Sequence, residues 1–93
     1  MALPNPAPVL DLIEAFRRSK TMFAAVSMGV FDRLAGGPAE AHRIRQDGED
    51  PDAFERFLDA CVSLGLLEKQ GEAYANSPAA ATYLRRDSGR PGV

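Results

Sequence analysis

The sequence has only one cysteine and no long apolar run, and both shortages narrow what the protein can be. Cys61 has no partner for an internal disulfide bond, which is typical of a reducing cytoplasm. No apolar run approaches the ~20 residues of a membrane-spanning helix. The N-terminal MALPNPAP lacks the basic and apolar regions of a signal peptide. We therefore expect a cytoplasmic protein that does not contact a membrane.

Residue patterns for metal, nucleotide or acid–base chemistry are also scarce. His42 is the only histidine, so with Cys61 it makes no sensible ligand set for a metal. No glycine-rich loop of the nucleotide-binding type is present. Cys61 is expected to be a buried, unreactive thiol, and Glu55 and Asp59 are expected to be solvated surface carboxylates. The sequence thus predicts no catalytic, cofactor-binding or metal-binding residue.

The length and composition of the chain indicate one small domain. The chain has 93 residues, of which 45% are hydrophobic, and this suffices for a packed core. A chain of this size has modest stability as a lone monomer. Its formal net charge of −2 argues against non-specific binding to a polyanion.

The clearest local signal is a helix followed by a hairpin. Asp50 is a plausible N-cap, Pro51 suits the first helical position, and Gly65 suits the left-handed residue that ends a helix. The apolar residues between them recur at helical spacing, at Phe54, Phe57, Leu58, Cys61 and Val62. Residues 66–69 and 73–75 then read as two short strands around Gly71. This order predicts the second half of a winged helix-turn-helix.

Winged helices most often bind DNA, but the charges here argue against it. The helix that would enter the major groove has Asp52, Glu55 and Asp59 against a single Arg56. A surface that faces phosphates needs the opposite sign. We therefore expect no nucleic-acid partner.

The first third of the chain reads as helix with an unusual apolar surface. Val9, Leu12, Ile13 and Phe16 form one stripe. Arg17, Arg18 and Lys20 interrupt this stripe, and we expect them to form a solvated charged turn rather than an anion-binding site. Residues 22–28 are then apolar almost all round, which indicates a helix buried on more than one face. That segment is either a subunit interface, a wall of an apolar pocket, or the central core helix of a monomer. Gly29 is expected to end it.

The remaining segments complete a three-part division of the chain. Residues 1–8 are expected to be a flexible lead-in, residues 9–87 the domain, and residues 88–93 a linker or tail. Residues 38–46 would be the first helix of the helix-turn-helix. Ser77 and Pro78 are expected to open a helix through Leu84, with Tyr83 and Leu84 covering the core.

Four segments in this order resemble the N-terminal dimerisation domain of the two-domain, S-adenosylmethionine (SAM)-dependent small-molecule O-methyltransferases. They are LDLIEAFRRSKTMFAAVSMGVFDRLA, DPDAFERFLDACVSLGLLEK, GEAYANSPAAATYL and RRDS. The resemblance covers residues 9–87 and includes the family's acetylserotonin, caffeate-type and polyketide O-methyltransferases. In the first segment the family signature matches Ala24, Ala25, Gly29, Phe31, Asp32 and Leu34. Residues 38–50 depart from the family pattern, so we expect the first helix-turn-helix helix to be distorted or mobile.

The resemblance implies a mainly α, winged-helix-like domain with a small β-hairpin wing, whose helices interleave in a homodimer. It also implies a catalytic, SAM-binding methyltransferase domain as partner, absent from this chain, so we expect the chain alone to bind no SAM and transfer no methyl group. By resemblance, the dimer interface or the wall of the substrate pocket would include Phe16, Met22, Phe23 and Val26.

Two alternatives remain from the sequence. One is a small winged-helix transcriptional regulator similar to the ArsR or MarR type, against which the acidic groove helix argues. The other is a free-standing interaction module that pairs with a methyltransferase chain.

Overall fold

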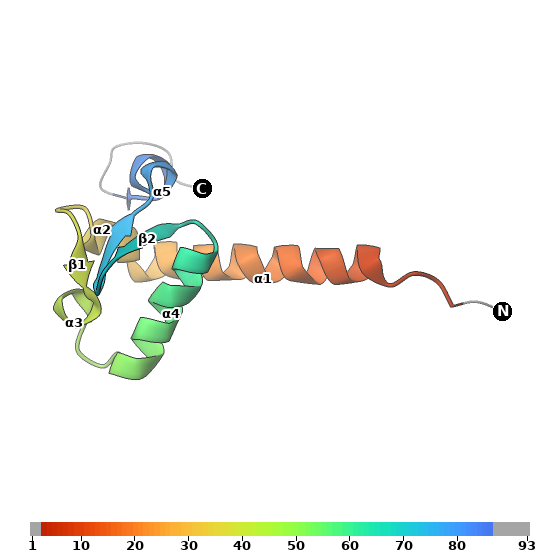
Figure 1. Ribbon diagram of the computed structural model, residues 1–93, viewed down its shortest axis with the longest axis horizontal. Helices are drawn as coiled ribbons and strands as arrows, with labels where there is room; N and C mark the ends of the chain where they lie inside the picture. The colour runs from red at the N-terminus through yellow and green to blue at the C-terminus, as the bar shows by residue number, and fades with distance from the viewer. Residues whose placement is uncertain (1–2, 87–93) are drawn as a thin grey trace.

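The computed structural model describes residues 3–86, and it shows a helical body from which one long helix projects (Figure 1). The elements in chain order are α1 (Ala7–Met28), α2 (Val30–Arg33), β1 (Ala39–Glu40), α3 (Ala41–Ile44), α4 (Pro51–Ser63), β2 (Leu67–Gln70), β3 (Ala73–Asn76) and α5 (Pro78–Tyr83). The molecule extends 58 Å along its longest axis and 31 and 25 Å along the others. Its radius of gyration, 15.6 Å, exceeds the roughly 12 Å of a compact chain of this length.

α1 is one continuous helix, in which Arg17, Arg18 and Lys20 are exposed to solvent, as predicted, without a turn that interrupts the helix. Arginine and lysine have good helix propensity, and neither glycine nor proline interrupts the chain between Val9 and Met28. The helix ends at Gly29, as predicted. Gly29 has a φ of 75°, and its N–H donates to the carbonyls of the last turn.

α4 forms as the sequence predicts. The Asp50 carboxylate accepts a 2.8 Å hydrogen bond from the backbone N–H of Ala53, and Pro51 occupies the first turn. Gly65, with a φ of 78°, follows the end of the helix. Of the five apolar residues predicted to share a face, Phe54, Leu58 and Cys61 are buried, and Phe57 and Val62 are partly buried against the same core.

The predicted hairpin is present, but it belongs to a three-stranded antiparallel sheet in the order β1-β3-β2. β2 pairs with β3 in a register that places Leu67 opposite Asn76, and Gly71, with a φ of 62°, lies in the turn. The third strand, β1, was not predicted. It pairs Ala39 with Tyr74 on the free edge of β3.

The helix predicted over residues 38–46 is therefore wrong for most of its length. Ala39 and Glu40 are extended, and only Ala41–Ile44 is helical, with Ile44 buried at its end. Few apolar residues in this segment were available to bury a helical face, whereas pairing with β3 satisfies backbone polar groups. The expected distortion of this part of the helix-turn-helix is confirmed.

α5 begins as predicted, because the Ser77 hydroxyl accepts a 3.2 Å hydrogen bond from the Ala80 N–H and Pro78 follows it. Leu84 is buried, but Tyr83 is 58% exposed, so its predicted role in covering the core is wrong. Tyr83, one position before Leu84, points about 100° away around the helix and toward solvent. The linker or tail predicted at 88–93 lies outside the described residues.

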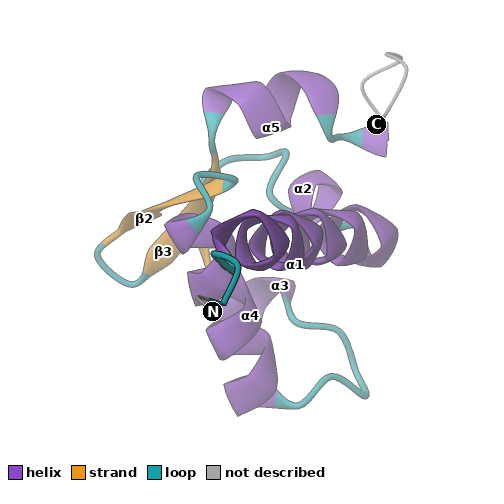
Figure 2. Cartoon of the chain, turned by 90° about the vertical axis from the view of Figure 1, so that its right-hand side faces the viewer, coloured by secondary structure: helices purple, strands orange, loops and turns teal. Residues whose placement is uncertain are grey.

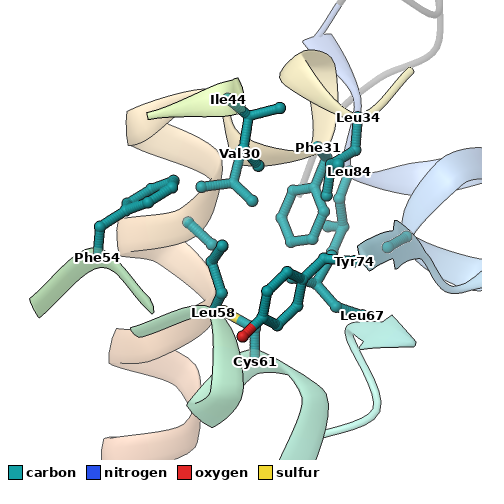
Figure 3. Packing of buried hydrophobic residues seen from close by; sticks show 12 residues of the cluster. Val30, Phe31, Leu34, Ile44, Phe54, Leu58, Cys61, Leu67, Tyr74 and Leu84 are labelled. Carbon is teal, nitrogen blue, oxygen red and sulfur yellow. The ribbon is translucent and has the colours of Figure 1, made fainter. Parts of the chain in front are cut away.

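The core lies where α1, α2, α4 and the sheet meet. Seen along α1, the short α5 lies above that helix and α4 below it (Figure 2). Val30, Phe31, Leu58 and Tyr74 turn toward one another at the centre (Figure 3) and are almost wholly buried. Only the C-terminal part of α1 reaches this core, through buried Ala25 and partly buried Met22, Val26 and Met28.

Candidate functional site

The N-terminal half of α1 is the most exposed apolar surface that the structure describes. From Pro8 to Lys20 every residue except Ala15 is exposed. The large apolar side chains on this stretch are Val9, Leu10, Leu12, Ile13 and Phe16, with exposed fractions from 42% to 72%. Contiguous apolar surface of this kind on a soluble domain marks an interaction site.

The four residues predicted for the interface or pocket wall divide into two pairs. Phe16 and Phe23 are 66% and 51% exposed, and they lie two turns apart on α1. Met22 and Val26 are partly buried and pack against the core. One pair therefore faces outward, and the other holds α1 onto the body.

Two of the shallow hollows that adjoin α1 and α4 have mainly apolar linings. One, of about 280 Å³, is lined by Met28, Phe54 and Phe57 together with Ala53 and the chain before α4. The other, of about 170 Å³, lies where Met22 meets Leu64 and Leu66. Of the four residues that the sequence predicted for the interface or pocket wall, only Met22 lines one of these two hollows.

Arg33, at the end of α2, ties several elements together. Its guanidinium donates to both carboxylate oxygens of Glu49, at 2.8 and 3.1 Å, and to the backbone carbonyls of Met28 and Ile44, at 2.8 and 3.1 Å. It also lies 5.5 Å from the ring centroid of Phe54. The hydrogen bond from Arg33 holds the pKa of Glu49 below its ordinary value. This cluster fixes the loop before α4 against the end of α1.

A second polar cluster joins α4 to the sheet. The Tyr74 hydroxyl donates a 2.5 Å hydrogen bond to Asp59, and Lys69 lies 3.4 Å from the same carboxylate. The bond from Tyr74 is the main reason that the pKa of Asp59 is lowered, while burial raises the pKa of Tyr74. Asp59 is thus an exposed surface carboxylate, as predicted, and it is also bonded to Tyr74 and Lys69.

Cys61 is fully buried, as predicted, and burial raises the pKa of its thiol to about 11. Such a thiol stays protonated and is a poor nucleophile or ligand. The described part of the chain contains no cluster of three His, Cys, Asp or Glu side chains arranged to hold a metal. Within residues 3–86, no helix combines the length and apolar character needed to cross a bilayer.

The family model for the O-methyltransferase dimerisation domain matches residues 10–86 of this chain. The chain belongs to this family. Its observed fold, a mainly helical domain with a small three-stranded antiparallel sheet, is that of the family's N-terminal domains. The outward-facing half of α1 is therefore the exposed surface of a domain whose family pairs subunits.

Individual relatives agree with this assignment. The chain is 45% identical over 78 residues to the N,N-dimethyltransferase OxyT of Streptomyces rimosus, matching 82% of this chain and 22% of that protein. It is 42% identical over 90 residues to the tetracenomycin polyketide synthesis 8-O-methyl transferase TcmO of Streptomyces glaucescens, matching 95% of this chain and 26% of that protein. The chain thus spans about a quarter of the length of these relatives.

Among solved structures, human N-acetylserotonin methyltransferase in complex with SAM superposes with a TM-score of 0.73 at 33% identity. The match covers 95% of this chain and 28% of the human chain. The resemblance inferred from the four sequence segments is confirmed.

Sequence reasoning missed the continuity of α1 and the two polar clusters. The lack of glycine and proline across residues 9–28 was the available signal for one long helix. The pairings of Arg33 with Glu49 and of Tyr74 with Asp59 join residues 16 and 15 positions apart. Local sequence patterns do not predict contacts between residues so far apart in the chain.

Proposed function

We propose that this domain pairs with a second copy of the same chain through the outward-facing half of α1. The observation that carries the proposal is the exposure of Val9, Leu12 and Phe16, which are 60%, 72% and 66% exposed on a helix that projects from the body. Burying one such side chain contributes about 1.5–3 kcal/mol, so a partner that covers several of them gains substantial free energy. Membership of a dimerisation-domain family supports a second copy as that partner.

The domain serves a SAM-dependent methyltransferase, and SAM and the methyl transfer are handled by residues outside this domain. The support is that TcmO and OxyT are methyltransferases and that the human relative was solved with SAM. Residues 1–93 also contain no glycine-rich nucleotide loop. Calorimetric titration of this chain with SAM is expected to give no heat of binding, and saturable heat at micromolar SAM would contradict this.

The four singled-out residues have separate roles in this proposal. Phe16 and Phe23 face the second copy, because both are more than half exposed. Val26 anchors α1 to the core. Met22 contributes to an apolar wall beside Leu64 and Leu66 that a methyl acceptor approaches in the assembled enzyme. A cytoplasmic location stays a prediction from the single cysteine.

Light scattering behind a sizing column tests the pairing. We expect the chain to elute as a dimer at tens of micromolar, and Phe16→Glu combined with Phe23→Glu to elute as a folded monomer, because a buried interface does not tolerate unpaired charges. Tyr83→Glu is the matched control, since Tyr83 is 58% exposed on α5 and should leave the dimer intact. A well-folded monomer of the unaltered chain would overturn the proposal.

A second variant separates pairing from folding. Val26→Asp places a charge where α1 meets the core, so it should weaken the fold and the dimer together. The Phe16→Glu and Phe23→Glu variant should keep its helical circular dichroism.

A further inference from the structure

Arg86, the last residue that the structure describes, is bonded to α2, 54 positions earlier in the chain. Its backbone N–H donates a 2.9 Å hydrogen bond to one carboxylate oxygen of Asp32, and its Nε lies 3.6 Å from the other oxygen. A backbone N–H that donates to a carboxylate makes a charge-assisted bond, which is stronger than a bond between neutral groups. We call Asp32 and Arg86 the exit clasp.

The helix that carries Asp32, α2, is itself held in place on both sides of that residue. Phe31 is fully buried, and its backbone carbonyl accepts a 2.9 Å hydrogen bond from the Asn76 side chain at the end of β3. Arg33 donates a 2.8 Å hydrogen bond to the carbonyl of Met28, the last residue of α1. A group that is bonded to Asp32 therefore keeps a fixed position relative to α1 and the sheet.

The surroundings of Arg86 define the path by which the chain reaches the clasp. Leu84, two residues earlier, is only 7% exposed and packs in the core, so the segment starts from a fixed point. A Cβ at Gly29 would lie 3.2 Å from Arg86 Nη2, so the guanidinium rests over the end of α1, where glycine leaves room for it. The Asp32 and Arg86 side chains are 25% and 62% exposed, and exposed ion pairs contribute little. The backbone hydrogen bond is therefore the stronger of the two contacts.

We propose that Asp32 fixes the direction in which the chain leaves this domain, by holding the Arg86 backbone against α2 and the end of α1. Residues that follow the last helix of a domain are poorly ordered unless a contact ties them down, and the exit clasp supplies that contact. This inference concerns residues of this chain alone and goes beyond the proposed dimerisation. Where a methyltransferase domain follows, the clasp sets the direction in which that domain starts relative to α1, and this consequence rests on the proposed function.

Residual dipolar couplings, measured by NMR on the weakly aligned chain, report the direction of the Arg86 N–H bond relative to α1. In the unaltered chain, the Arg86 coupling should fit the alignment tensor that the amides of α1 and α4 define. Asp32→Ala removes both acceptor oxygens, so the Arg86 coupling should shrink toward zero as the freed segment samples many directions. Hydrogen exchange of the Arg86 amide should rise about tenfold or more, which is the effect of losing a hydrogen bond to a charged group.

Three controls separate release of the clasp from loss of the fold. The Leu84 N–H donates to the Ala80 carbonyl at the end of α5, so its coupling and exchange rate should stay unchanged in Asp32→Ala. Asp11→Ala removes an exposed carboxylate from α1, with the same change of net charge, and should leave Arg86 unaffected. Arg86→Gln removes the exposed guanidinium but keeps the backbone N–H, so the amide at position 86 should stay protected from exchange.

Release of Arg86 in Asp32→Ala, with Leu84 unchanged and with no release in Asp11→Ala or Arg86→Gln, supports the inference. A coupling near zero for Arg86 in the unaltered chain overturns it, and so does an unchanged Arg86 in Asp32→Ala. Release of Leu84 together with Arg86 also overturns it, because the contact would then only stabilise α5. These results do not depend on the sizing-column test: a monomer with a fixed Arg86 overturns the dimerisation proposal and leaves the clasp standing, whereas a dimer with a mobile Arg86 does the reverse.

Discussion

The cluster around Arg33 makes the stability of the domain depend on one carboxylate, and Glu49→Gln tests this. The Arg33 and Glu49 side chains are only 11% and 22% exposed. Removing one partner of a buried ion pair costs about 3–5 kcal/mol, and less where water reaches the site. Glutamine keeps one acceptor oxygen for Arg33 and for the Gln46 N–H, which now donates to Glu49 at 2.8 Å. We therefore expect a loss of about 2 kcal/mol in the free energy of unfolding, within the range for hydrogen bonds to charged groups.

Urea denaturation at fixed protein concentration measures this loss. Glu68→Gln is the matched control, because Glu68 is exposed on β2, and surface substitutions usually change stability by less than about 0.5 kcal/mol. If Glu49→Gln and Glu68→Gln unfold at the same urea concentration, the Arg33 cluster does not stabilise the fold and the reasoning is refuted.

The same pair predicts the direction of a pH effect. The pKa of Glu49 is lower in the folded chain than its ordinary value of 4.5, mainly because of the hydrogen bond from Arg33. The stability that the ionised Glu49 carboxylate contributes is therefore fully present above pH 4.5 and is lost as the pH falls through the folded-state pKa. Between neutral pH and pH 3, the unaltered chain should lose more stability than Glu49→Gln, and equal losses would contradict this account.

Two further substitutions test the α4–sheet contact and the end of α1. Tyr74→Phe removes the 2.5 Å hydrogen bond to Asp59 and should lower the free energy of unfolding, measured by urea denaturation, by about 1–3 kcal/mol, as for hydrogen bonds to charged groups. The variant should also lose less stability in acid than the unaltered chain, because that bond no longer lowers the pKa of Asp59. An unchanged unfolding midpoint would argue against this bond. Gly29→Ala should cost about 1–2 kcal/mol, since the φ of 75° disfavours a side chain and a Cβ would lie 3.2 Å from the Arg86 guanidinium. Gly36→Ala is the control and should leave the stability unchanged, because a Cβ at Gly36 meets no atom within 4 Å. Equal melting temperatures for Gly29→Ala and Gly36→Ala would refute the predicted strain at Gly29.

Elements with strong local signals were predictable from the sequence. The caps at Asp50 and Ser77, the stop at Gly65 and the apolar periodicity of α4 each depend on residues within a few positions of one another. The same holds for the end of α1 at Gly29. Family membership was recognisable because these local signals occur in a fixed order along the chain.

Tertiary structure decided the features that local pattern left open. β1 exists because the free edge of β3 offers backbone hydrogen bonds to a segment with too little apolar surface for a long helix. Tertiary contacts also decide which residues of α1 are buried. Residues 22–28 are apolar almost all round, and only the position of α2 and α4 determines that Ala25 is buried while Phe23 remains exposed.

The sequence by itself determined the family, the helical character of the chain and the apolar residues of α1, because these follow from residue type and spacing. Only the folded chain decided that α1 continues through Arg17 and Lys20, and that Arg33 reaches Glu49 across 16 positions. The physical reason is that helix propensity acts locally, whereas burial of a charge and exposure of an apolar face depend on which distant segments pack against them.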